Sequence, residues 1–235
     1  MARYPSRAPL DASEGGVAAV DRALMLMKAF GVGERALSLQ QLADRTGMVK
    51  STMLRLLLSL QHFSLVHRLD DGQYALGPGI ARLYGTYISS FSLDTVIPPV
   101  LRALVAATQE SASFHVRQGD VRLLLFRVNS PQPLSDHSRA GDLFPLERGS
   151  GGRVILAFSG ARGEVYDRIR KDKVIGLIGE RVPDLAGISS PVFQDGNHLV
   201  GALTLTMPKV RYRKEHLAAV RGHAAELSRK LGGDF

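Results

Sequence analysis

The chain has 235 residues, a formal net charge of +8 at pH 7 and an isoelectric point near 10.0. Its 45% hydrophobic and 22% charged residues are close to globular averages, which argues against global disorder, and its length favours two compact domains. The absence of cysteine excludes a disulfide framework and a thiolate metal site, and it fits a reducing compartment. The positive charge favours an anionic partner, with nucleic acid first.

The first 16 residues, MARYPSRAPLDASEGG, form a polar leader without the apolar core of a secretory signal, and we expect them to be disordered. No apolar run in the sequence approaches the roughly 20 residues that span a bilayer. These two observations predict a cytoplasmic protein that has no membrane partner.

Three helices are predicted between residues 17 and 63. Residues 17–30 place apolar side chains at helical spacing, and the glycines of GVGE end that helix. Ser38 and Gln41 have the spacing of a capping box that starts a second, short helix, and Gly47 suits the left-handed turn that ends it. A third helix is predicted from residue 49 to residue 63, directly after this turn.

A β-hairpin is predicted after the third helix. The stretch VHRLDDGQYAL contains two short apolar strands around Asp71-Gly72, the sharpest hairpin signal in the chain. Three helices, a glycine turn and a hairpin together predict a winged helix-turn-helix domain at residues 17–78. The third helix divides into a broad apolar face, predicted to be buried, and a polar stripe. The apolar face comprises Met53, Leu54, Leu57, Leu58 and Leu60, and the polar stripe comprises Ser51, Thr52, Arg55 and Ser59.

The polar stripe has the chemistry to read a DNA major groove. Arginine can pair with guanine through two hydrogen bonds, serine and threonine reach phosphates or base edges, and a helix N-terminus favours a phosphate. The segment from Arg45 to Leu69 contains no acidic residue. The alternative is a small helical bundle whose polar stripe only faces water. The candidate DNA contacts are Lys50, Ser51, Thr52 and Arg55 in the groove, Arg22 and Arg45 on the first two helices, and His67 and Arg68 on the wing.

Helix and strand signals alternate in the second half, after a linker helix predicted at residues 79–92. In residues 93–235, two strand-like runs meet at Gly119-Asp120 and two more meet across residues 195–197. A helix is predicted from about Ser150 to Phe158, beside glycines whose missing side chains let a ligand approach backbone N–H groups. An amphipathic helix closes the chain. This order predicts an α+β domain in which helices bracket an antiparallel sheet.

Two sets of segments, in order along the chain, resemble the IclR family of bacterial transcription regulators. The first set is VAAVDRAL, SLQQLADRTGMVKSTMLRLLLSL and YALGPGIARL, and the second is PLERGSGGRVILAF, IRKDKVIGLIGERVPDLAGISSPVF and LVGALTLTMP. The resemblance covers almost everything after the leader. It implies a DNA-binding winged helix-turn-helix, a GAF-like effector-binding domain that takes a small molecule, often a carboxylic acid, and a dimer or a dimer of dimers.

Residues of the effector pocket follow from this resemblance by position. They are Ser150 and Gly151 at the helix start, Ile178, Gly187, and Thr204 and Thr206 on the last strand, with Phe126 and Leu143 as apolar wall candidates. Strand alternation places Thr204 and Thr206 on one face, so their hydroxyls can meet one ligand. The alternative is that both threonines are ordinary strand formers.

The chain departs from the family pattern at two places. Leu177 and Ile178 stand where many members carry acidic or polar residues, and Gly187 replaces a cysteine that some members place near the pocket. We therefore expect a larger and more apolar pocket, and an aromatic acid such as a hydroxybenzoate in preference to glyoxylate or pyruvate. The connection at residues 159–173 is shorter than is usual in the family and lacks room for one helix, which affects one wall of the pocket or the access to it.

Motifs of catalysis are missing from the sequence. The seven histidines are scattered, and HExxH, GxSxG and phosphate-binding-loop patterns do not occur. We expect no catalytic residue, no metal ligand and no cofactor. The predicted protein is a ligand-responsive repressor of a catabolic operon, whose partners are a double-stranded DNA operator, a small carboxylic acid and further copies of the chain. The alternative is a DNA-binding protein whose second domain serves only oligomerisation.

Overall fold

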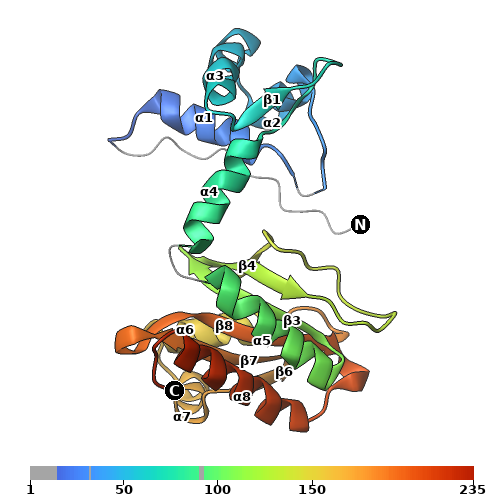
Figure 1. Cartoon of the computed structure of the whole chain (residues 1–235), viewed down its shortest axis with the longest axis vertical. Helices are drawn as coiled ribbons and strands as arrows, with labels where there is room; N and C mark the ends of the chain where they lie inside the picture. Colours follow the sequence, from blue (N-terminus) through green and yellow to red (C-terminus); the bar gives the residue numbers. More distant parts are fainter. Residues whose placement is uncertain (1–14, 32, 90–92) are drawn as a thin grey trace. The chain divides into compact units, whose positions relative to one another are not determined.

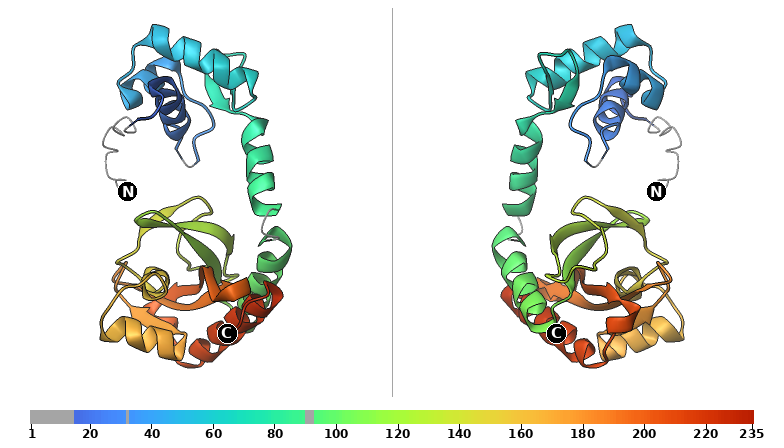
Figure 2. Two further views of the ribbon diagram at one scale, coloured as in Figure 1. Left: turned by 90° about the vertical axis from the view of Figure 1, so that its left-hand side faces the viewer. Right: turned by 90° about the vertical axis from the view of Figure 1, so that its right-hand side faces the viewer.

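The computed structural model describes residues 15–31, 33–89 and 93–235, and Figures 1 and 2 show it from three directions. The chain divides into two compact units, Met1–Phe91 and Ser92–Phe235. Residues 1–14 of the predicted leader lie outside the described part. Among the described helices, none combines the length and the apolar character that crossing a membrane requires.

The first unit has the order of elements expected of a winged helix-turn-helix (Figure 1). Its elements are α1 (Ala18–Lys28), α2 (Leu39–Thr46), α3 (Lys50–His62), β1 (Val66–Arg68), β2 (Tyr74–Leu76) and α4 (Pro78–Ser89). The two strands form the antiparallel wing, in which Val66 pairs with Leu76 and Arg68 with Tyr74. Two backbone hydrogen bonds of 2.8 Å between Leu37 and Tyr74 tie the wing to the chain just before α2.

Local chemistry fixes both ends of α2, as the sequence predicts. The Ser38 side chain accepts a hydrogen bond from the Gln41 backbone N–H at 3.2 Å, and the Gln41 side chain accepts one from the Ser38 N–H at 2.8 Å. This capping box satisfies two N–H groups that the helix itself leaves without a partner. Gly47 ends the helix with φ 69° and ψ 9°, a left-handed conformation that costs glycine little. The tight turn into α3 follows from these residues.

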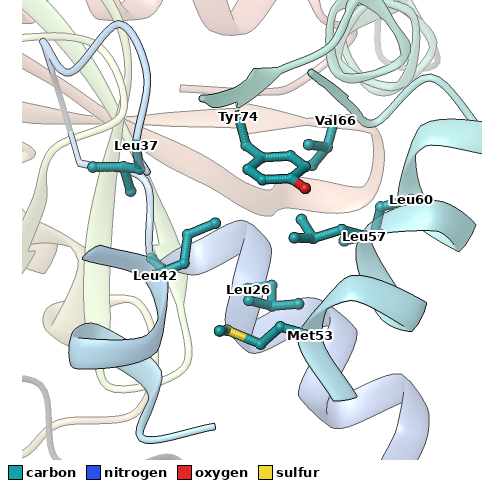
Figure 3. Close-up of a cluster of buried hydrophobic side chains, with 9 residues drawn as sticks. Leu26, Leu37, Leu42, Met53, Leu57, Leu60, Val66 and Tyr74 are labelled. Carbon is teal, nitrogen blue, oxygen red and sulfur yellow. The ribbon is translucent and has the colours of Figure 1, made fainter. Parts of the chain in front are cut away.

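Side chains from all three helices and the wing meet in one apolar core, which Figure 3 shows in close-up. Leu26 of α1, Leu42 of α2, and Met53 and Leu57 of α3 are fully buried, and the Tyr74 ring of the wing is 3% exposed. Burial of such side chains contributes roughly 1.5–3 kcal/mol each. This core holds α3 rigidly against α1 and α2 while the rest of its surface faces outward.

The apolar face of α3 is narrower than the sequence analysis predicted. Met53, Leu57 and Leu60 are buried, but Leu54 is 41% exposed and Leu58 is 67% exposed. Residues at i, i+4 and i+7 form a single stripe, and Leu54 and Leu58 lie one residue further on, about 100° around the helix. The prediction that both leucines are buried is therefore wrong for this chain.

The second unit is an α+β domain built on a six-stranded antiparallel sheet in the order β5-β4-β3-β8-β7-β6 (Figure 1). Hairpins join β3 to β4 and β7 to β8, as predicted. The elements are α5 (Leu93–Thr108), β3 (Ser111–Gln118), β4 (Val121–Val128), β5 (Leu143–Pro145), α6 (Ser150–Ala157), α7 (Glu164–Asp172), β6 (Ile175–Ile178), β7 (Leu185–Gln194), β8 (His198–Pro208) and α8 (Glu215–Lys230), with short 3-10 turns at Asp195–Asn197 and Lys209–Arg211.

Helices cover the two faces of this sheet differently (Figure 2). The helices α5 and α8 pack on each other and on β3, β4, β7 and β8, whereas α6 packs on β7 and β8 with α7 beside it. On the α5 and α8 side the central strands present apolar side chains such as Phe114 and Leu203, which are fully buried. On the α6 side the same strands present buried hydroxyls, from Ser113, Ser189 and Thr204. A polar inner layer therefore lies between the sheet and α6.

The short connection at residues 159–173 holds the helix α7. Tyr166 and Ile169 of α7 pack with Val154 and Ile155 of α6 in a second apolar cluster. The shortened connection therefore still forms a helix, and that helix supports the pocket wall that α6 provides.

The exposure of the leucines on α3 gives a matched pair of stability tests. Leu57→Ala should destabilise the first unit by about 2–5 kcal/mol, because it empties a fully buried site. Leu58→Ala should stay within about 0.5 kcal/mol of the parent chain, because most of that side chain already contacts solvent. Amide hydrogen exchange of α1–α3 measures both effects in the full chain. Equal losses would show that Leu58 is covered in solution.

Candidate DNA-binding surface and ligand cavity

The polar stripe of α3 lies on the surface beside α1. Ser51, Thr52, Arg55 and Ser59 are all exposed. Thr52, Arg55 and Ser59 line a shallow groove that is completed by Arg22 of α1. The structure therefore brings Arg22 next to the helix that was predicted to read DNA. This groove wall combines hydroxyls with two guanidinium groups.

The remaining predicted DNA contacts lie at the ends of this surface. Lys50 is the first residue of α3 and is exposed, which puts a cation at the N-terminal end of the helix. His67 and Arg68 are exposed on the first strand of the wing. The Arg68 guanidinium lies 5.8 Å from the centre of the Tyr74 ring and donates to the Gly72 carbonyl at 3.4 Å, so it also stiffens the wing.

Arg45 has a structural role that the sequence analysis missed. Its guanidinium donates to the Glu34 carboxylate at 2.5 and 2.6 Å and to the Ala29 carbonyl at 2.9 Å. The hydrogen bond from Arg45 lowers the pKa of Glu34 to about 2. These bonds join the end of α1 to α2. Both terminal nitrogens of Arg45 are engaged within the fold, which argues against its predicted role as a DNA contact.

A cavity lies between the sheet and the start of α6. Its space for water-sized molecules is about 40 Å³. A single water needs about 10–15 Å³ of such space, so the cavity holds roughly three. Five of the predicted ligand residues line it: Ser150, Gly151, Gly187, Thr204 and Thr206.

The hydroxyls of two lining residues, Ser150 and Thr204, are connected through that of Ser189. Ser189 of β7 lies between the other two, with its Oγ 2.8 Å from Ser150 Oγ and 2.8 Å from Thr204 Oγ1. All three side chains are buried, which makes each hydrogen bond costly to leave unmade. Thr204 and Thr206 do share one strand face, as alternation predicts. Ser189 was not predicted, although alternation from Gly187 points to it.

The predicted wall residue Leu143 and the predicted pocket residue Ile178 do not line the cavity. Leu143 is 49% exposed and Ile178 is 55% exposed, and their neighbours Phe144 and Leu177 line the cavity instead. Successive side chains of a strand lie on opposite faces, so an error of one residue reverses the orientation. The predictions for Leu143 and Ile178 are therefore wrong by one position.

Phe126 is displaced by a β-bulge. The pairing of β3 with β4 runs Phe114 with Phe126 and then His115 with Leu124, so an extra residue is inserted in β4. Such an insertion shifts the alternation of the strand by one residue. Phe126 therefore shares the face of Phe114, and Arg127 lines the cavity in its place. The prediction for Phe126 is wrong for this reason.

The cavity is polar and basic, in contrast to the predicted apolar pocket. Arg122, Arg127 and Arg181 line it together with His115 and Glu180. The expectation of an apolar pocket, based on Leu177, Ile178 and Gly187, is therefore wrong, and the expectation of a larger one stays a prediction. The signal that the sequence analysis missed is the β4 sequence VRLLLFRV. Two arginines, Arg122 and Arg127, flank an apolar run there, and each of them has to lie on one of the two faces of the sheet.

Arg122 is the most deeply buried cation of the cavity, with only 4% of its surface exposed. Its Nη1 donates to His115 Nδ1 at 3.2 Å, its Nη2 donates to the Arg148 carbonyl at 3.3 Å, and its guanidinium carbon lies 5.0 Å from the centre of the Phe144 ring. Burial, and then the charge of Arg181, lower the pKa of Arg122 to about 10. The group therefore stays cationic at neutral pH.

His115 is held neutral beside this cation. Burial, and then the charge of Arg122, lower the pKa of the imidazole well below its usual value. A neutral ring that accepts from Arg122 at Nδ1 carries its proton on Nε2, and Nε2 lies 3.1 Å from Ser113 Oγ. His115 therefore connects Arg122 to the Ser113 hydroxyl of the sheet through one hydrogen bond at each ring nitrogen.

The carboxylate of Glu180, which lines the cavity, and that of Asp136, which pairs with the lining Arg127, are already bound to other groups. Glu180 accepts from the Gly149 backbone N–H at 2.6 Å and from Arg153 at 2.6 and 3.0 Å. Asp136 forms a buried ion pair with Arg127 at 2.5 Å. Burial raises the pKa of Asp136, but the charge of Arg127, the hydrogen bonds from Ser138 and Arg127 and the charge of Arg181 together outweigh it, so the pKa falls below its usual value.

Comparison with known protein families finds a match in the unit that carries α3 and another in the unit that holds the cavity. Residues 19–70 match the IclR helix-turn-helix domain, and residues 85–171 match the C-terminal domain of the bacterial transcriptional regulator IclR. The chain belongs to the IclR family of bacterial transcriptional regulators. It is a DNA-binding regulator and not an enzyme.

Relatives within the IclR family are distant in sequence. The HTH-type transcriptional regulator Rv1719 of Mycobacterium tuberculosis is 31% identical over 148 residues, which cover 63% of this chain and 56% of that protein. The glycerol operon regulatory protein of Streptomyces coelicolor is 26% identical and covers 92% of this chain and 97% of its own. An IclR homologue from Microbacterium hydrocarbonoxydans, solved with 4-hydroxybenzoate, has a TM-score of 0.82 at 18% identity and covers 91% of this chain and 99% of its own. The last likeness establishes the fold.

The two arginines Arg55 and Arg45 give a test of the DNA-binding surface. Arg55→Ala should weaken binding to a selected specific duplex by about 1–3 kcal/mol and relax the preference at one base pair. Arg45→Ala should leave this affinity nearly unchanged and cost about 0–1 kcal/mol of stability, because it breaks a partly exposed ion pair. Fluorescence anisotropy on the selected duplex and on a scrambled one measures both. An equal loss on both duplexes would place Arg55 on phosphate.

Gly151 gives a test of the cavity. A Cβ at this position would lie 3.0 Å from Thr204 Oγ1 and 3.3 Å from Arg122 Nη1, so Gly151→Ala should fill the site and weaken effector binding by about tenfold or more. Because alanine favours a helix, the stability of the free chain should not fall by more than about 1 kcal/mol. Gly222→Ala on α8, where a Cβ meets nothing within 4 Å, is the control that should bind normally. Titration calorimetry separates the two outcomes.

Proposed function

We propose that this IclR-family regulator is a cytoplasmic repressor of a catabolic operon and that a small carboxylic acid controls its binding to DNA. The observation that carries the proposal is a buried, basic cavity in a chain that also presents an exposed reading helix. Arg122 is buried there, and it forms no ion pair with another described residue. A buried charge without a partner destabilises the fold, so a bound acid would stabilise it.

The DNA contacts in this proposal follow the exposed residues of the first unit. Lys50, Ser51, Thr52 and Arg55 enter the major groove, and Arg22 contacts the adjacent phosphates. His67 and Arg68 of the wing contact the DNA backbone or the minor groove. Arg45 is not part of this set, because it is bound to Glu34.

The effector in this proposal is held at the start of α6. Ser150, Thr204 and the backbone at Gly151 offer donors to a carboxylate, and the N-terminus of a helix favours an anion. The neighbour from Microbacterium hydrocarbonoxydans that binds 4-hydroxybenzoate supports an aromatic acid. The small, polar cavity of this chain supports a compact acid more strongly. The proposal therefore keeps the carboxylic acid and does not require an aromatic ring.

A dimer or a dimer of dimers completes the proposal. One reading helix contacts only a few base pairs, and a symmetric pair doubles the length of the recognised site. The helix α4 follows the wing directly, and it is the segment through which acid binding would change the spacing of two reading helices.

The decisive experiment measures operator binding by the full chain with and without acids. A selected duplex is titrated by fluorescence anisotropy in the presence of acetate, pyruvate, malonate, succinate, benzoate or 4-hydroxybenzoate, with uncharged amides as controls. At least one acid should change the affinity for DNA and raise the melting temperature by several degrees, since ligand at about 100 times its Kd stabilises by about 2.7 kcal/mol. Normal DNA binding that no acid changes would favour the alternative, a second domain that serves only oligomerisation.

A further inference from the structure

Leu58 is the most exposed apolar side chain of α3, with 67% of its surface accessible to solvent. Leu54, one turn earlier, is 41% exposed, so the two leucines form a short apolar strip on the helix. Neither of them belongs to the apolar core, to which α3 contributes Met53, Leu57 and Leu60. A single exposed leucine is common on protein surfaces, so the position of this strip decides whether it has a role.

Leu58 lies on the same side of α3 as the predicted DNA contacts. Successive residues of an α-helix are about 100° apart, so Leu58 lies about 20° around the helix from Ser51 and about 60° from Arg55. Both of those side chains are exposed. The preceding residue, Leu57, is fully buried in the core of the first unit (Figure 3). Leu58 therefore belongs to the exposed face that carries the polar stripe.

The two polar side chains that follow Leu58 in this part of the helix are bound to the helix backbone. Ser59 Oγ donates to the Arg55 carbonyl at 3.4 Å, and Gln61 Nε2 donates to the Leu57 carbonyl at 3.2 Å. A side chain that donates to its own helix has given up that donor for an outside partner. At this turn the helix therefore offers the apolar surface of Leu58 beside the guanidinium of Arg55.

The major groove of DNA contains one apolar group that such a side chain fits. Each thymine exposes its C5-methyl group there, whereas cytosine carries only a hydrogen at the same carbon. Removing apolar surface from water is favourable, so a leucine packed on this methyl group favours thymine at that position. The segment from Arg45 to Leu69 contains no acidic residue that would repel the DNA.

We propose that Leu58 is a specificity-determining residue that packs on the C5-methyl group of a thymine in the operator. This inference rests on the proposed DNA contacts of α3 and adds a base preference to them. Side chains at positions i and i+3 of a helix are about 5–6 Å apart, and successive base pairs are about 3.4 Å apart. The thymine therefore lies about one or two base pairs from the position that Arg55 reads.

The test changes the methyl group alone. In a duplex selected for tight binding, each thymine is replaced in turn by deoxyuridine, which keeps the hydrogen-bonding groups and lacks the methyl. Fluorescence anisotropy on the full chain should find a position, close to the one at which Arg55→Ala relaxes the preference, where uracil weakens binding about fourfold, as expected for one buried CH₂ group. At the same position, 5-methylcytosine should bind about fourfold tighter than cytosine.

Variants assign the methyl contact to Leu58. Leu58→Ala should bring both ratios, thymine to uracil and 5-methylcytosine to cytosine, close to one. Leu58→Met keeps a long apolar side chain and should retain most of the difference. Leu134→Ala is the matched control, because Leu134 is 63% exposed and belongs to the second unit, so both ratios should stay as in the parent chain.

The possible failures are distinguishable. A parent chain that binds every uracil duplex as tightly as the thymine duplex would overturn the inference, and so would a uracil effect that Leu58→Ala leaves intact. If that intact effect came with a changed molar mass of the free Leu58→Ala protein in sedimentation, the leucine would belong to a contact between proteins instead. A sequence preference that Arg55→Ala does not change would remove the proposed reading role of α3 itself.

Discussion

A buried guanidinium is the constraint on which the second domain depends. Arginine keeps its charge at neutral pH even when burial lowers its pKa, as it does for Arg122. The guanidinium of Arg122 contacts three neutral groups: the imidazole of His115, the carbonyl of Arg148 and the face of the Phe144 ring. These groups orient the cation and do not neutralise it. This unpaired charge is what supports the proposed binding of an acid in the cavity.

In the first domain, by contrast, an arginine is paired with a carboxylate. Arg45 is bound to Glu34, and both side chains stay partly exposed, so the pair closes the fold without creating a binding site. Arg55 lies ten residues further along on an exposed stripe and makes no ion pair with another described residue. The same residue type therefore supports the fold at one position and offers free donors at the other. The difference is whether an acid lies within reach.

Strand alternation decides the chemistry of the cavity. The central strands present apolar side chains to α5 and α8 and hydroxyls to α6, and a single bulge in β4 moves Arg127 to the cavity side and Phe126 to the other. An insertion of one residue in a strand therefore replaces an aromatic wall with a charged one. For this reason a small change in pairing has a large effect on which ligand fits.

Local signals in the sequence determined much of the fold. The capping box at Ser38, the left-handed turn at Gly47 and the hairpin at Asp71-Gly72 depend on residues within a few positions of one another, so the winged helix-turn-helix could be predicted from them. The two hairpins and the helices α5, α6 and α8 of the second domain followed from the same kind of signal, whereas β5, α7 and β6 were not predicted.

Only the tertiary structure decided which side chains meet. The partner of Arg45 lies 11 residues away, and Arg122 contacts Arg148, which lies 26 residues away. The orientation of Phe126 depends on a bulge that appears only when β3 and β4 are paired. The exposure of Leu58 depends on how α3 packs on α1 and α2. Such contacts join distant parts of the chain, and no local pattern records them. The sequence therefore determined the elements and the family, and the packing of those elements decided the charge of the cavity.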